Sequence, residues 1–109
     1  MILETYLEQQ REWSRRVFGP GKRTRGILQH IEKEIAEVRQ DPEDVMEWVD
    51  IIILALDGAW RAGYTPEQVA EALSKKQAIN FARTWPTPVS EDVAVQHIHS
   101  EVGPEQLLI

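Results

Sequence analysis

The chain has 109 residues, a net charge of −6 and no cysteine. A chain of this length forms one small domain with a modest core, and the missing thiols exclude disulfides, zinc–thiolate sites and cysteine nucleophiles. The acidic balance argues against a nucleic-acid partner, because phosphate contacts require a basic face. The apolar runs are too short to span a membrane, and the acidic, amphipathic N-terminus does not resemble a signal peptide. We therefore expect a cytoplasmic protein with no membrane partner.

Apolar residues at helical spacing predict two helices in the first 40 residues. The first helix carries an apolar stripe from Leu3 to Val17 and ends at residues 18–21, where two glycines flank a proline. The second begins near Thr24, and its pattern continues to Val38. Its core residues are expected to be Ile27, Leu28, Ile31, Ile35 and Val38. The sequence shows no strand pattern and no internal repeat.

Two start signals predict the third and fourth helices. Asp41 is a favourable N-cap and Pro42 suits the first helical position, so the third helix is expected to begin there. Thr65 and Gln68 form a capping box at the start of the fourth helix, which is expected to end near Arg83. The expected core residues of these two helices are Val45, Val49, Ile52, Ile53, Leu56, Trp60, Val69, Leu73 and Ile79.

The third helix is apolar on nearly every side. Beyond its core stripe it carries Met46, Trp48, Ile51, Leu54 and Ala55. A helix that is apolar all round is buried all round, which in so short a chain predicts burial against a second copy; cover from the C-terminal tail is the alternative. The predicted fold is an all-α four-helix bundle that assembles as a homo-oligomer. Residues 1–86 form its helical domain, and residues 87–109 form an irregular tail or oligomerisation segment.

Two acidic pairs flank the turn at residues 41–42. Glu34 and Glu37 precede the turn, and Glu47 and Asp50 follow it, each pair at i,i+3 spacing on one helix face. An antiparallel hairpin brings the four carboxylates to one site, where they repel one another unless a multivalent cation neutralises them. Hard oxygen ligands select Mg²⁺ or Mn²⁺. A solvated acidic face is the alternative, but the second pair opens a run too apolar for a surface helix.

A basic stripe on the fourth helix adds a second group of candidate site residues. Lys76, Asn80 and Arg83 follow i, i+4, i+7 spacing, so one helix face presents two cations and an amide. By itself this pattern is typical of a helix end whose positive charges complement the macrodipole. Together with an acidic metal site it suits a polyphosphate, because Lys and Arg neutralise the oxygens that the metal does not bind.

These residues resemble the MazG-like all-α nucleoside triphosphate pyrophosphatases. The acidic pairs match that family's E-x-x-E and E-x-x-D pattern, and the basic stripe matches its K-x3-N-x2-R element. Longer stretches, residues 30–34, 47–64 and 80–86, are similar to the subgroup of dATP/dGTP diphosphohydrolases, some of which are encoded by phages. The resemblance covers about residues 18–86 and implies hydrolysis of a nucleoside triphosphate to the monophosphate and pyrophosphate by a homodimer or homotetramer.

The resemblance also implies roles for individual residues. Two or three Mg²⁺ ions, which Mn²⁺ can replace, would be held by Glu34, Glu37, Glu47 and Asp50. Either Glu34 or Glu37 would orient or deprotonate the attacking water. Lys76 and Arg83 would hold the leaving pyrophosphate, while Asn80 would contact sugar or phosphate. Trp13 offers a stacking surface for the base, although an aromatic on an amphipathic stripe is commonly a core residue.

The sequence alone does not fix the preferred nucleotide, and it leaves two other classes of protein to be considered. The subgroup resemblance favours dGTP, with dATP next. A di-iron carboxylate bundle is disfavoured because such sites carry Glu-x-x-His motifs, which this sequence lacks; His30 is expected at the edge of the second helix or orienting a carboxylate. The remaining alternative is a non-catalytic helical module that binds a metal or nucleotide and uses the apolar third helix as a partner surface.

Overall fold

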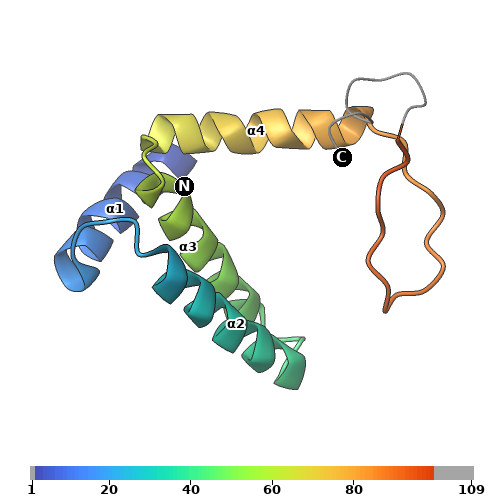
Figure 1. The fold of residues 1–109 in the computed structure, drawn as a ribbon, viewed down its shortest axis with the longest axis horizontal. Helices are drawn as coiled ribbons and strands as arrows, with labels where there is room; N and C mark the ends of the chain where they lie inside the picture. Colours follow the sequence, from blue (N-terminus) through green and yellow to red (C-terminus); the bar gives the residue numbers. More distant parts are fainter. Residues whose placement is uncertain (1, 100–109) are drawn as a thin grey trace. The chain divides into compact units, whose positions relative to one another are not determined.

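The computed structural model describes residues 2–99 and confirms an all-α architecture (Figure 1). Its helices are α1 (Leu3–Phe18), α2 (Thr24–Gln40), α3 (Val45–Arg61) and α4 (Pro66–Ala82). Within the described residues, β pairing is limited to an isolated antiparallel bridge between Thr84 and Ile98. None of the helices in this part of the chain combines the length and apolarity that a bilayer crossing requires. The chain divides into two compact units between Ala72 and Leu73.

The first unit is built around α3, which packs along α2 and also contacts α1. Its core consists of Leu7, Trp60 and Val69, with Leu56 and other partly buried residues packed against them. A Cβ added at Gly58 would meet the side chain of Ile27 at 3.7 Å, an ordinary van der Waals distance, so this glycine lies where α3 packs against α2. The two helices run side by side as a hairpin (Figure 1).

Local start signals were predicted with mixed success. The capping box is confirmed, since Gln68 N donates to Thr65 Oγ1 (3.1 Å) and Thr65 N donates to Gln68 Oε1 (2.9 Å). The predicted N-cap at Asp41 is wrong, because residues 41–44 form a turn and α3 begins only at Val45. Asp44 caps the helix instead, accepting a hydrogen bond from Met46 N at 2.9 Å. Both aspartates suit a cap, and the intervening turn decides which of them occupies it.

Several residues expected in the core are exposed. Leu28 and Ile52 are each 54% exposed, and Val45 is 66% exposed. The expectation that these residues lie in the core of a single chain is therefore wrong, because within the first unit the helices leave parts of α2 and α3 uncovered. Ile35, which was also expected in the core, is 38% exposed, and Met46 and Trp48 of the same hairpin are exposed as well.

The second unit contains the C-terminal part of α4 and the segment that follows it. Trp85 Nε1 donates to the carbonyl of Asn80 (2.9 Å), and His97 makes an edge contact with the Trp85 ring. Leu73 and Ile79 are 57% and 41% exposed, so their predicted burial is not observed. Residues 87–99 contain no helix, and residues 100–109 of the predicted tail lie outside the described part, so the irregular tail stays a prediction.

Candidate metal centre

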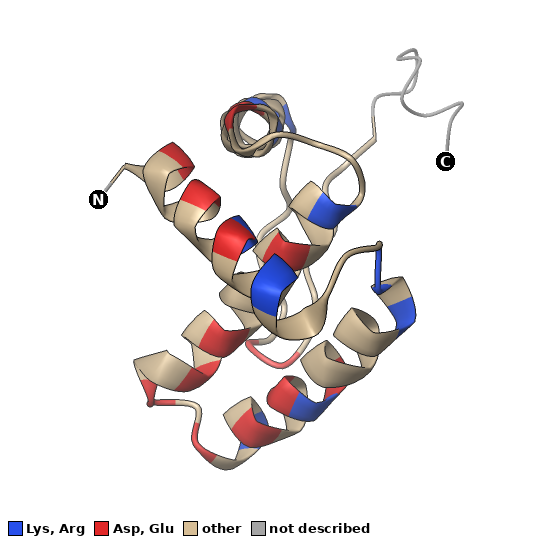
Figure 2. Ribbon diagram, turned by 90° about the vertical axis from the view of Figure 1, so that its left-hand side faces the viewer, with Lys and Arg blue, Asp and Glu red and all other residues tan. Residues whose placement is uncertain are grey.

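The four acidic residues predicted to share a site do so. Glu34 and Glu37 project from α2, Glu47 and Asp50 project from α3, and one carboxylate oxygen of each lies within 4.8 Å of the others. Figure 2 shows acidic residues on both helices of the hairpin, near the turn that joins them. The geometry follows from the sequence, because each i,i+3 pair occupies one helix face and the hairpin turns those faces toward each other.

Part of this cluster is buried and has no Lys or Arg partner among the described residues, an arrangement that a solvated acidic face does not require, although Asp50 is exposed. Glu34 is only 7% exposed. The Oε2 atoms of Glu34 and Glu47 are buried and have no hydrogen-bond partner among the described residues. Burying a charged oxygen without a partner is costly. A divalent cation bound by hard oxygen ligands would supply the missing partner, so the donor set fits Mg²⁺ or Mn²⁺.

The excess of negative charge in the cluster also shifts the pKa values of its glutamates. A hydrogen bond with Glu37, followed by burial and the charges of Glu37 and Asp50, raises the pKa of Glu34. The same hydrogen bond lowers the pKa of Glu37. Burial, followed by the charge of Glu37, raises the pKa of Glu47. The metal-free cluster thus retains protons more readily than isolated glutamates do, and a bound cation would displace them.

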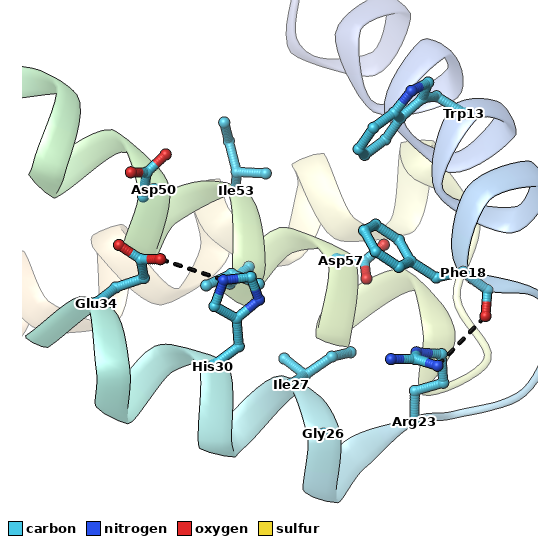
Figure 3. A pocket seen from close by; sticks show the side chains of 11 residues that line it. Trp13, Phe18, Arg23, Gly26, Ile27, His30, Glu34, Asp50, Ile53 and Asp57 are labelled. Atoms are coloured by element: carbon cyan, nitrogen blue, oxygen red, sulfur yellow. Dashed lines mark hydrogen bonds and ion pairs between the residues drawn. The ribbon is translucent and has the colours of Figure 1, made fainter.

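His30 lies one helical turn before Glu34 and contacts it. The His30 Nε2 atom is 3.2 Å from Glu34 Oε1, which confirms that this histidine orients a carboxylate (Figure 3). Its side chain is half exposed. The contact leaves Glu34 Oε2 without a partner among the described residues, so one oxygen of this glutamate is held and the other is available to a ligand.

A pocket of about 200 Å³ extends from the acidic cluster along α2 and α3. Glu34 and Asp50 line one end, and Trp13 and Phe18 of α1 line the other (Figure 3). Trp13 is 47% exposed, and its ring makes an edge contact with Phe18 at 5.5 Å between centroids. Trp13 is therefore a wall of the pocket and not a core residue, and its place beside a nucleotide base stays a prediction.

The same pocket contains two residues that were not predicted from the sequence, Asp57 and Arg23. Asp57 is 7% exposed and forms an ion pair with the buried Arg61, with 3.0 Å between Oδ2 and Nε. A sequence signal existed, because Asp57 follows Asp50 by seven residues and hence lies on the same helix face. An i,i+4 Asp–Arg pair inside an apolar helix is also a mark of a buried ion pair.

The predicted basic stripe lies in the second unit. Arg83 Nη1 donates to Asn80 Oδ1 (3.2 Å), so these two side chains are together. Lys76 is exposed on α4, whereas Arg83 follows the last residue of that helix. Because the two units are each described by themselves, the place of Lys76, Asn80 and Arg83 beside the acidic cluster stays a prediction.

Comparison with solved structures defines the class of the fold. The MazG-like pyrophosphohydrolase of cyanophage S-2L, solved with dGDP and three catalytic Mn²⁺ ions per active site, matches with a TM-score of 0.68 and 28% sequence identity. The match covers 91% of this chain and 99% of that protein. The chain therefore has a MazG-like fold, and the relative with this fold binds a divalent metal and a purine nucleotide.

Comparison of sequences identifies the family. The dATP/dGTP pyrophosphohydrolase model matches residues 6–105, a longer span than the motifs between residues 18 and 86. The dATP/dGTP diphosphohydrolase of cyanophage S-2L is 36% identical over 81 residues, which cover 72% of each chain. The Eaa protein of Salmonella phage P22 is 32% identical over 68 residues; this alignment covers 62% of the chain and about a fifth, 20%, of the Eaa protein.

The protein belongs to the dATP/dGTP pyrophosphohydrolase family. It is thereby a hydrolase acting on phosphoric anhydrides. Family membership favours this enzyme over the non-catalytic interaction module that the sequence left open.

Proposed function

We propose that the protein hydrolyses a purine deoxynucleoside triphosphate, dGTP in preference and dATP next, to the monophosphate and pyrophosphate. The observation that carries this proposal is the convergence of four carboxylates within 4.8 Å, at the end of a pocket whose other end is aromatic. A triphosphate has the corresponding chemistry, because its anionic oxygens require cations and its purine requires an apolar, stackable surface.

The acidic cluster would hold Mg²⁺ or Mn²⁺ through Glu34, Glu37, Glu47 and Asp50, with two or three ions per site. When bound, such ions neutralise phosphate oxygens and lower the pKa of water, which makes a nucleophile available near neutral pH. The reaction breaks the bond between the α-phosphorus and the oxygen that bridges to the β-phosphorus. The water oxygen enters the monophosphate, and pyrophosphate leaves with the bridging oxygen.

Two glutamates of the cluster are suited to handle the water proton. Either Glu34 or Glu37 would orient the water and accept its proton, because both carboxylates lie in the acidic cluster that would hold the metal. His30 would keep Glu34 in position through its 3.2 Å contact. Lys76 and Arg83 would neutralise the leaving pyrophosphate, and Asn80 would contact sugar or phosphate.

The exposed apolar side chains of the α2–α3 hairpin support a homo-oligomer as the working form. Val45 and Met46, both about two-thirds exposed, lie with Trp48 and Ile52 on the helix that carries half of the acidic cluster. Burial of such side chains against a second copy would remove apolar surface from water. A homodimer or homotetramer is proposed, acting in the cytoplasm.

A panel of the eight common nucleoside triphosphates tests this function. The metal-stripped protein would be incubated with each nucleotide in turn, with and without Mg²⁺ or Mn²⁺, and the products would be separated by anion-exchange chromatography. We expect metal-dependent release of dGMP and pyrophosphate, with dATP the next best substrate. Release of a diphosphate and phosphate, or a preference for dCTP or dUTP, would overturn the proposal.

A further inference from the structure

We propose that Asp57 reads the Watson–Crick edge of the purine and thereby selects guanine over adenine. This inference rests on the proposed function, because it concerns the base end of the same pocket. Asp57 lines the pocket together with Trp13 and Phe18, at the end away from Glu34 and Asp50 (Figure 3). Asp57 follows Asp50 by seven residues, which corresponds to about 10 Å along the helix at 1.5 Å per residue. A nucleotide has a comparable length between its α-phosphate and the far edge of its purine.

Asp57 has one carboxylate oxygen that is paired and one that is not. Its Oδ2 accepts from Arg61 Nε at 3.0 Å. Its Oδ1 is buried and has no hydrogen-bond partner among the described residues. An oxygen in this state is costly unless a ligand or water donates to it. Asp57 is among the residues that line the pocket, and the proposal places the edge of a bound base against this oxygen.

Arg61 cannot provide the missing hydrogen bond. A guanidinium has five N–H groups, and all of those on Arg61 have acceptors. Nε donates to Asp57, while Nη1 donates to the carbonyls of Gly19 and Gly21, each at 2.9 Å. Nη2 donates to the carbonyl and the hydroxyl of Ser14. The arginine therefore fixes the orientation of Asp57 and leaves Oδ1 available.

The chemistry of a fixed carboxylate oxygen distinguishes the two purines. Guanine presents two adjacent donors on its Watson–Crick edge, N1–H and the N2 amino group, and the unpaired Oδ1 of Asp57 can accept from both as a shared hydrogen bond. Adenine presents the N1 lone pair beside its N6 amino group, so a carboxylate placed there meets a second acceptor. A site built for a hydrogen bond rejects a base that leaves its buried group unpaired.

The walls of the pocket suit the purine plane. Trp13 and Phe18 lie at 85° to each other, so a base can stack on one ring and meet the edge of the other. Arg23 lies over the Phe18 ring at 5.6 Å and donates to the Phe18 carbonyl, which holds this aromatic in position. The proposal places the base against these aromatic walls with its Watson–Crick edge toward Asp57.

Nucleotide analogues test the assignment on the unmodified protein. Deoxyinosine triphosphate lacks the N2 amino group, whereas 7-deaza-dGTP keeps the Watson–Crick edge and alters only the opposite side. We expect kcat/KM for deoxyinosine triphosphate to be lower than that for dGTP by about 10-fold or more, because a hydrogen bond to a charged acceptor is lost. The 7-deaza analogue should be used as well as dGTP. Equal use of deoxyinosine triphosphate and dGTP would overturn the assignment.

The variant Asp57→Asn tests the residue itself. An amide can donate to adenine N1 and accept from N6, so the ratio of kcat/KM for dGTP to that for dATP should fall by about 10-fold or more. Glu32→Gln, which makes the same change of charge at an exposed position of α2, is the matched control and should keep the ratio. An unchanged ratio in folded Asp57→Asn overturns the assignment. If this variant does not fold by circular dichroism, the analogue series on the unmodified protein decides.

The proposed function and this inference can fail separately. If no triphosphate is hydrolysed, the proposed function fails, and calorimetric binding of dGMP, dIMP and dAMP to the unmodified protein then tests Asp57 without turnover. Tighter binding of dGMP than of both others supports the assignment, and equal binding overturns it. If dGTP is hydrolysed with no effect of the N2 amino group or of Asp57→Asn, the function stands and Asp57 is excluded as the base-reading residue.

Discussion

The two ends of α3 both carry buried or partly buried carboxylates, but the protein treats them in opposite ways. Near the C-terminal end, Asp57 is paired with Arg61, whose five N–H groups are all satisfied. Near the N-terminal end, Glu47 and Asp50 face two further glutamates, and among the described residues no Lys or Arg forms an ion pair with this cluster. The first arrangement neutralises charge with the chain's own residues, whereas the second has no Lys or Arg partner among the described residues and fits a bound cation.

The largest expected effect comes from removing a carboxylate of the cluster. In Glu47→Gln or Asp50→Asn, hydrolysis should fall by about 10³-fold or more, because metal-derived stabilisation of several kcal/mol is lost. The fold should persist, since the substitution also relieves repulsion among the acids. Steady-state kinetics would measure the loss of hydrolysis, and titration calorimetry with Mn²⁺ would measure the loss of metal affinity. Glu32→Gln is the control, and near-normal activity of either cluster variant would contradict the metal assignment.

Removal of the internal counter-charge should act on stability. Arg61→Met leaves Asp57 buried without its partner and releases the carbonyls of Gly19 and Gly21, so we expect a loss of about 3–5 kcal/mol in the free energy of unfolding. Urea denaturation followed by circular dichroism measures it. Arg39→Met, at an exposed position of α2, is the control. A loss of unfolding free energy no larger than that of the control would show that burial of Asp57 does not require its ion pair with Arg61.

A smaller effect is expected at the aromatic end of the pocket. Trp13→Ala removes a stacking surface and should raise KM for dGTP about tenfold with little change in kcat. Trp13→Phe keeps an aromatic face and should recover most of the affinity. These values come from initial rates at saturating Mg²⁺. If the alanine variant binds dGTP as tightly as the unmodified protein, Trp13 is only a neighbour of the base.

The smallest effect concerns the pH dependence of metal-free stability. The pKa of Glu34 is raised above its ordinary value of 4.5, so its contribution to stability is present below that value and is lost as the pH rises through the raised pKa. Glu34→Gln stays neutral and avoids this loss. The variant should therefore match the unmodified protein near pH 4 and have the higher Tm near pH 7 without metal.

Added Mn²⁺ should reverse that order, because the unmodified protein gains more from binding the ion. Glu37 has the opposite pH dependence, since its lowered pKa adds stability that is lost as the pH falls through that pKa. In Glu34→Gln the new side-chain amide can still donate a hydrogen bond to Glu37, so the variant retains this contribution to stability. Thermal scans at both pH values provide the test. A variant that is less stable than the unmodified protein at pH 7 without metal would show that the cluster does not strain the fold.

The sequence predicts the architecture and the acidic cluster because both depend on periodicity. Helical spacing gives the number and type of the helices, and i,i+3 pairs on either side of a turn place Glu34 and Glu47 in one site. The capping position was misjudged because Asp41 and Asp44 both suit it, and only the turn geometry separates them. Burial was overestimated for Val45 and Ile52, because an apolar pattern does not reveal whether the covering surface belongs to the same chain.

Asp57 was missed for a different physical reason. The role proposed for it depends on the unpaired state of one carboxylate oxygen, and that state follows from how Arg61 distributes its donors among three segments of the chain. No local pattern encodes such a distribution. Trp13 shows the converse, because the sequence left open whether this aromatic stacks on a base or lies in the core, and the structure places it in the pocket wall.

The most direct test of the account is hydrolysis of dGTP in ¹⁸O-labelled water by metal-stripped protein to which Mn²⁺ or Mg²⁺ is then added. If the four carboxylates form a metal-dependent site for attack at the α-phosphorus, no product should appear before metal is added. Afterwards mass spectrometry should find the label in dGMP and not in pyrophosphate. Hydrolysis at the same rate without metal, or label in pyrophosphate or inorganic phosphate, would contradict the account.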